Sequence, residues 1–259
     1  MGEHKNPDPI EEARRRINAE ALHDPEKREL LQKHHAIAAP LLDELVELGY
    51  DVDTLDDLRH QGKPWRSAIP ALLRWLPRIN DPDVKENIVR CISVPWVGNK
   101  ATAELISEFK RYAPIDPDHV EDLSNLSAAQ FIKHLSNVKR CDPSTSLAWA
   151  IGNALSIVDV KGFEKQIMDL CRNREYGTAR QMLVLGLGRF SSSEAEEVMV
   201  ELLNDEDVKL HAIIALGKMK SKRALFELEK LLTDKRAAIR KEARKAITKI
   251  MRLKSDGGA

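Results

Sequence analysis

One stretch of the chain, residues 204–217, sets a pattern of polar and apolar positions that much of the sequence repeats. Asn204 and Asp205 favour a turn, and an aspartate at position 205 or 207 can accept hydrogen bonds from the free N–H groups at a helix start. Apolar side chains then recur at the spacing of one helix face, at Val208, Ala212, Ala215 and Leu216. The pattern predicts a turn and then a helix that opens near residue 206. Gly217 either ends that helix or lets a neighbouring helix approach closely.

The same pattern returns along the chain. Its equivalent apolar positions, which we call the reference residues, are Val84, Leu147, Ala179, Val208 and Ile239. They follow one another at intervals of 63, 32, 29 and 31 residues. The first interval is about twice the others, so we expect one unit to contain an insertion. Helix pairs that recur at such a period stack into a solenoid, because one pair cannot bury its apolar face alone.

The repeated units resemble HEAT repeats of the short bacterial type. The resemblance is carried by the aspartate turn, the small residue four positions on, the terminal Leu-Gly, and the pairs Val84-Lys85, Val208-Lys209 and Ile239-Arg240. It covers roughly residues 64–252. It implies a right-handed α-solenoid in which the second helix of each pair lines the concave side. Because one fold supports many functions, the resemblance says little about activity.

We predict an all-α protein in three parts. Residues 1–63 form an N-terminal tail and helical cap, residues 64–254 form a solenoid of about five helix pairs, and residues 255–259 form a disordered tail. A helical insertion of about residues 113–144 lies within the second pair. Insertions in solenoids often decorate a functional face, but they are also tolerated as plain surface. The sequence leaves both interpretations of this insertion open.

Side chains beside the core stripe of the second helices are the candidates for binding. Positions two and six residues after each reference residue lie one helix turn apart on the same face. They predict a groove with an apolar centre around Trp149 and with basic ends, which is typical of protein-recognition sites. The alternative is that Trp149 turns inward and fills a seam. The candidate partner-binding residues are Arg90, Trp149, Asn153, Gln181, Leu210, Ile214, Lys241 and Lys245.

The last predicted helix is strongly basic. Residues 235–254 carry nine Lys or Arg and one acid, Glu242, for a net charge of +8. The terminal repeat of a solenoid needs a polar outer surface, and cations suit a helix C-terminus. These charges therefore either keep the end of the solenoid solvated or contact phosphate groups or an acidic protein.

Overall composition limits the classes of function. Charged residues make up 32% of the chain, aromatic residues 5%, and the formal net charge is +0, so no global preference for polyanions is expected. The three cysteines, Cys91, Cys141 and Cys171, have no C-x-x-C spacing. This predicts neither a disulfide framework nor a metal site, and it favours a reducing compartment. Since no apolar leader or membrane span is present, we expect a cytoplasmic protein that does not bind membranes.

Enzyme motifs are absent from the sequence. Deoxyhypusine hydroxylase, a HEAT-repeat enzyme, uses His-Glu pairs that bind two irons, but His211 is followed by Ala212 and no His-Glu dipeptide occurs. DNA glycosylases of the alkylation-repair type are similar in architecture and use a catalytic carboxylate. No Asp or Glu lies beside Trp149 in a recognisable pattern. We predict a non-enzymatic scaffold or adaptor that binds another protein, with no cofactor. The alternative is a nucleic-acid-binding protein or such a glycosylase, acting through the basic last helix.

Overall fold

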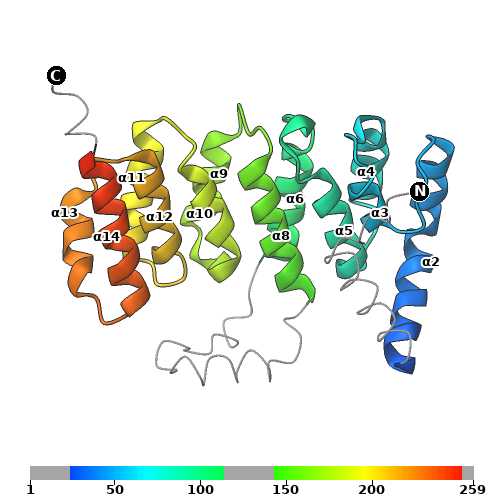
Figure 1. Cartoon of the computed structure of the whole chain (residues 1–259), viewed down its shortest axis with the longest axis horizontal. Coiled ribbons are helices and arrows are strands. Elements are labelled where there is room, and N and C mark those ends of the chain that lie inside the picture. The colour runs from blue at the N-terminus through cyan, green and yellow to red at the C-terminus, as the bar shows by residue number, and fades with distance from the viewer. Residues whose placement is uncertain (1–23, 114–142, 253–259) are drawn as a thin grey trace, which may run out of the picture.

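The computed structural model describes residues 24–113 and 143–252. Helices and short 3-10 helices stand side by side in a row from α2 to α14, and the described ranges contain no strand (Figure 1). The α-helices are α2 (Pro25–Glu47), α3 (Leu55–Arg59), α4 (Ile69–Trp75), α5 (Pro82–Ile92), α6 (Thr102–Tyr112), α8 (Pro143–Ile157), α9 (Glu164–Arg172), α10 (Gln181–Leu187), α11 (Ser193–Glu201), α12 (Lys209–Met219), α13 (Leu225–Lys230) and α14 (Ala237–Met251). The 3-10 helices are η1 (Arg66–Ala68), η2 (Pro95–Val97), η5 (Arg174–Arg180), η6 (Leu202–Asn204) and η7 (Leu231–Thr233). This arrangement confirms the predicted all-α solenoid.

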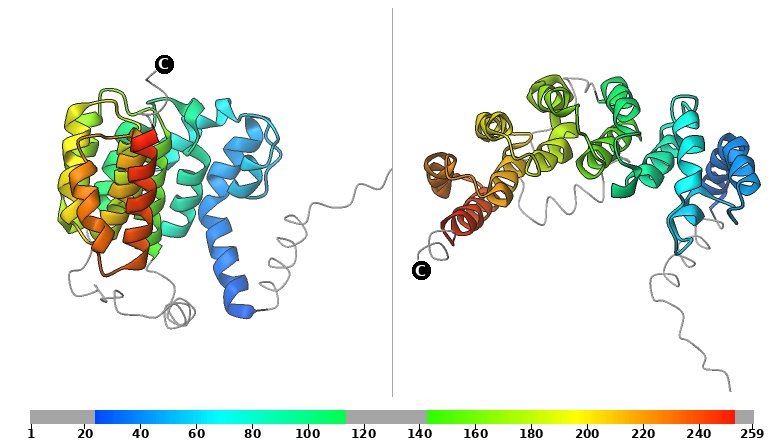
Figure 2. Two further views of the ribbon diagram at one scale, coloured as in Figure 1. Left: turned by 60° about the vertical axis from the view of Figure 1, so that its left-hand side comes forward. Right: turned by 90° about the horizontal axis from the view of Figure 1, so that it is seen from above.

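The helices form two layers. Each first helix packs against the second helix that follows it, as in α6 with α8, α11 with α12 and α13 with α14. The second helices also contact one another in the order α5, α8, α10, α12, α14. Seen from above, the row bends into an arch whose outer side carries the first helices and whose inner side carries α8, α10, α12 and α14 (Figure 2, right). The right-handed twist and the number of pairs stay predictions.

Small residues let the second helices approach closely. A Cβ atom built on Gly217 of α12 would lie 2.9 Å from the Ala246 Cβ atom of α14. The corresponding positions one repeat earlier show the same contact, because a Cβ on Gly188 would lie 3.3 Å from the Ala215 Cβ. Gly217 therefore permits the close approach and does not end the helix, which continues to Met219.

Replacing Gly217 with leucine should lower the free energy of unfolding by about 1–3 kcal/mol, because the added side chain has no room between α12 and α14. Thr248 holds the same position in α14, nine residues after its reference residue, and is exposed. Thr248→Leu is therefore the matched control and should change stability by no more than about 0.5 kcal/mol. Urea unfolding followed by circular dichroism measures both. Equal effects at the two positions would contradict this account of the packing.

Buried charges connect successive repeats. The residue directly after the reference residue is basic and buried in three units: Lys85, Arg180 and Lys209. Each contacts a carboxylate of the next repeat, namely Glu108, Asp205 and Asp234 respectively. These pairs lie between packed helices, where leaving one charge unpaired is costly.

The helix start predicted near residue 206 is wrong by about one turn. Helix α12 begins at Lys209, its N-cap is Val208, and no side chain caps it. Asp205 accepts hydrogen bonds from the buried Arg180 guanidinium and from the Asp207 N–H. The carboxylate is therefore used by the preceding repeat and by the turn, and not by the helix that follows.

The last repeat ends the stack with polar side chains. Five positions after the reference residue, Val184 and Ile213 are buried between neighbouring second helices. The same position in α14 is Arg244, which is exposed. This replacement supports the interpretation of α14 as a solvated terminal surface.

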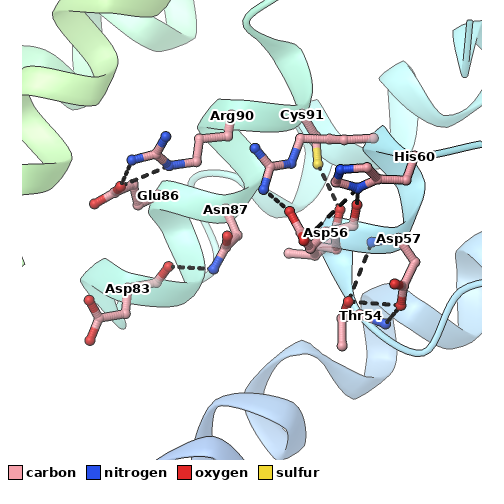
Figure 3. A network of polar contacts seen from close by, with 11 residues as sticks. Thr54, Asp56, Asp57, His60, Asp83, Glu86, Asn87, Arg90 and Cys91 are labelled. Carbon is pink, nitrogen blue, oxygen red and sulfur yellow. Dashed lines mark hydrogen bonds and ion pairs between the residues drawn. The ribbon is translucent and has the colours of Figure 1, made fainter. Parts of the chain in front are cut away.

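At the other end, α2 and α3 pack against α4 and α5. Asp24 caps α2, and Thr54 and Asp57 form a capping box at the start of α3 (Figure 3). The predicted tails and nearly all of the insertion 113–144 lie outside the described residues, so these domain boundaries stay predictions. Among the described helices, none combines the length and apolar character that a membrane crossing requires.

Candidate protein-binding face on the second helices

The predicted binding residues all lie on the second helices α5, α8, α10, α12 and α14. Trp149 and Asn153 belong to α8, Gln181 begins α10, and Leu210 and Ile214 belong to α12. Since α8 contacts α10 and α10 contacts α12, these side chains follow one another along the arch. The remaining candidates are Arg90 on α5 and Lys241 and Lys245 on α14. We call this set of residues the ladder face.

The centre of the ladder face is apolar and open. The Trp149 side chain is 41% exposed, so it does not fill an internal seam. Leu210 is half-buried and packs against the core, and Ile214, one turn further along the same helix face, is also half-buried. A half-buried apolar side chain keeps part of its area available for a partner while the scaffold fixes its position.

Polar groups in the centre are partly committed to the fold. The Gln181 side-chain amide donates to the Asp207 carbonyl oxygen at 3.1 Å, which ties the start of α10 to the turn before α12. Asn153 is half-buried, and its backbone carbonyl accepts from the Ser156 hydroxyl. Gln181 is therefore a residue that holds two repeats together, while the Asn153 side chain has no hydrogen bond with other described residues.

Arg90, the cation at the N-terminal end of the ladder face, is paired with a carboxylate. Arg90 donates through Nε to Glu86 Oε1 at 2.9 Å on the exposed side of α5 (Figure 3). The other carboxylate oxygen of Glu86 accepts from Ser146 Oγ of α8 at 2.7 Å. The predicted basic rim is largely neutralised here, because the guanidinium has a carboxylate that is itself held in place.

At the C-terminal end of the ladder face, on α14, one of the two candidate lysines is paired and the other has no carboxylate partner among the described residues. Lys245 forms an ion pair with Glu242 at 2.6 Å. Lys241 and Lys249 are exposed, and neither has a carboxylate partner among the described residues. The ladder face thus carries its free positive charge at α14 only.

One residue of this region was missed by the sequence pattern. His211 follows Leu210 on α12 and is half-buried, and its Nδ1 atom is enclosed without a hydrogen-bond partner in the described structure. Burial lowers the pKa of its imidazole, so the neutral form is favoured at neutral pH. The sequence does not mark His211 as a functional residue, because no metal or nucleophile motif surrounds it.

Comparison with known families agrees with the geometry. A family profile described as HEAT repeats matches residues 164–248, which hold α9 to most of α14. Residues 164–248 belong to the HEAT-repeat family. The HEAT repeats carry Gln181, Leu210, Ile214, Lys241 and Lys245, while Arg90, Trp149 and Asn153 lie on α5 and α8, which continue the same stack of second helices. No curated protein matches the chain.

Proposed function

We propose that this chain is a non-enzymatic scaffold or adaptor that binds another protein through the ladder face. The observation that carries the proposal is the open apolar centre, in which a 41%-exposed Trp149 precedes Leu210 and Ile214 along the inner layer. Large apolar side chains that stay accessible on a rigid helix layer are the usual anchors of protein interfaces. HEAT repeats in general mediate protein–protein interaction, which supports the same proposal.

The partner would present apolar side chains to Trp149 and Leu210 and at least one carboxylate to α14. Lys241 supports the second part, because it is exposed and has no carboxylate partner in the part of the chain that the structure describes. Arg90 contributes less to this attraction, since Glu86 already neutralises it. Charge at the rim speeds association and sets orientation more than it adds affinity.

Cysteine chemistry is not part of the proposed function. Cys91 and Cys171 are both buried. Burial raises the pKa of the Cys91 thiol to about 12, and it also raises the pKa of Cys171. A thiol held protonated at neutral pH is a poor nucleophile, so these two side chains act as small core residues.

The second candidate function is binding to nucleic acid through α14. It is favoured by exposed cations without carboxylate partners in the described structure, at Lys235, Lys241, Arg244 and Lys249. Other cations of this segment are engaged, such as Arg236 with Asp234 and Glu206. The formal net charge of the whole chain is +0, so this positive region is balanced by acidic residues elsewhere in the sequence.

The double variant Trp149→Ala and Leu210→Ala should weaken capture of the partner at least about tenfold, because aromatic and apolar anchors carry much of the energy of an interface. The tagged full chain is cross-linked in extracts of its native cells, and partners are quantified by mass spectrometry for wild type and variants. Phe226→Ala is the matched control, since Phe226 is 66% exposed but lies on α13 in the outer layer.

Partners retained by a folded double variant, or lost equally in Phe226→Ala, would contradict the proposed face. Binding of duplex DNA at physiological salt that is abolished by charge reversal at Lys241 and Lys245 would favour the second candidate. Phosphate contacts weaken steeply with salt, so binding seen only at low salt does not count for it.

A further inference from the structure

A histidine and two aspartates from distant parts of the chain meet where α2 packs near the start of α5. His34 lies on α2, Asp81 is the N-cap residue of α5, and Asp83 lies in the first turn of α5. His34 Nε2 is 3.6 Å from Asp81 Oδ1 and 3.5 Å from Asp83 Oδ2. One ligand atom from each residue lies within 4.8 Å of the other two. The three side chains are all partly buried.

The two separations that involve His34 are longer than direct hydrogen bonds and match the spacing of two ligands on one ion. An N–H···O hydrogen bond spans about 2.7–3.2 Å, which is shorter than both His34 distances. Zinc binds imidazole nitrogen at about 2.0–2.1 Å and carboxylate oxygen at about 2.0–2.2 Å in tetrahedral geometry. Two ligands of such a site are therefore separated by roughly 3.3–3.5 Å. The His34 nitrogen stands at nearly this separation from both carboxylates.

The charges around the cluster favour a cation. Asp81 and Asp83 contribute two negative charges, and the positive N-terminal end of α5 offsets only about half a charge. The Asp83 carboxylate is not used by Asn87, whose amide donates to the Asp83 backbone carbonyl instead (Figure 3). Lys33 Nζ lies 3.5 Å from Asp81 Oδ2, and its side chain is 63% exposed. Lys33 is thus a flexible cation that a bound ion would displace.

We propose that His34, Asp81 and Asp83 bind a Zn²⁺ ion that fastens helix α2 to the start of α5. Imidazole together with carboxylates suits zinc, whereas Mg²⁺ and Ca²⁺ prefer sites built from oxygen alone. Three protein ligands leave a fourth position for water. The ion would connect α2 to the start of α5, so its role is to hold this end of the described stack together.

The test is calorimetric titration of Zn²⁺ into the metal-free full chain. His34→Ala and Asp83→Asn should each weaken the tightest binding step at least about tenfold, since each removes a direct ligand. Asp81→Asn should do the same while preserving the N-cap, because asparagine also accepts the hydrogen bond from the Val84 N–H. His35→Ala is the matched control, since His35 is the exposed neighbour of His34 and should leave binding unchanged.

A second readout separates binding from a merely structural role. Lys33→Ala should tighten Zn²⁺ binding a few-fold, because a competing cation is removed from Asp81. Zn²⁺ should also slow amide hydrogen exchange in α2 of the wild type and not of Asp83→Asn. The proposal is overturned if wild type does not bind Zn²⁺, if all variants bind it alike, or if Mg²⁺ or Ca²⁺ binds these residues in preference to Zn²⁺.

Discussion

Replacing Arg180 with alanine should lower the free energy of unfolding by about 3–5 kcal/mol, because it breaks a buried ion pair and leaves one charge behind. Arg180 is fully buried. It donates from Nη1 to Asp205 Oδ2 at 2.8 Å and to the Cys171 carbonyl at 3.0 Å, and from Nε to the Gly177 carbonyl at 2.9 Å. After the substitution the Asp205 side chain, 5% exposed, loses its bidentate partner.

Arg172→Ala is the matched control for this loss. Arg172 also bridges two repeats, with Nε 2.9 Å from Glu201 Oε2, but both side chains are solvated. Exposed pairs contribute about 0–1 kcal/mol, so the control should stay close to wild type in urea unfolding followed by circular dichroism. Arg174 Nε, 3.5 Å from Asp205 Oδ2, can partly replace the lost charge, so Arg174→Ala should add to the effect of Arg180→Ala. Equal losses for Arg172→Ala and Arg180→Ala would refute the assignment of a special role to the buried pair.

The fold was predictable because its core follows a local rule. Val84, Val208 and Ile239 hold equivalent positions in their repeats, and each is buried within or directly before a second helix. A stripe of apolar residues at helical spacing predicts a helix and the face that it buries. Because the neighbouring repeat covers that face, the same pattern also predicts how the helices stack. Gly217 could be recognised as a helix residue, but its role needed the position of Ala246 in the next repeat.

The charged contacts were less predictable because they depend on which repeat supplies the partner. Asp205 resembles a helix cap in sequence, whereas its carboxylate belongs to Arg180, which precedes it by one repeat. His34 and Asp81 come from different helices, so no spacing motif could join them. For the ladder face, the sequence predicted which helix positions lie outside the core, but it did not show that Glu86 neutralises Arg90. The binding role of that face stays a proposal.

Glu108→Gln should lower the free energy of unfolding by a similar amount, about 3–5 kcal/mol, because it leaves a buried ammonium without its counter-charge. We call the contact between α5 and α6 that this pair spans the first junction of the solenoid. Lys85 on α5 is fully buried and forms an ion pair with Glu108 of α6. The Tyr112 ring, with its centroid 4.9 Å from Lys85 Nζ, offers only a weak cation–π contact in compensation. Glutamine keeps the shape of the side chain, so the loss measured by urea unfolding reports the charge and not a cavity.

The double variant Lys85→Met and Glu108→Leu separates two explanations of that loss. If the cost arises from one unpaired buried charge, removing both charges should restore stability to near the wild-type level or above it, since buried pairs can be replaced by apolar residues of similar volume. A double variant as unstable as Glu108→Gln would instead mean that the pair itself stabilises the junction. Since each repeat contacts only its neighbours, a weakened junction should also split the unfolding transition, with α2 to α5 unfolding before α6 to α14.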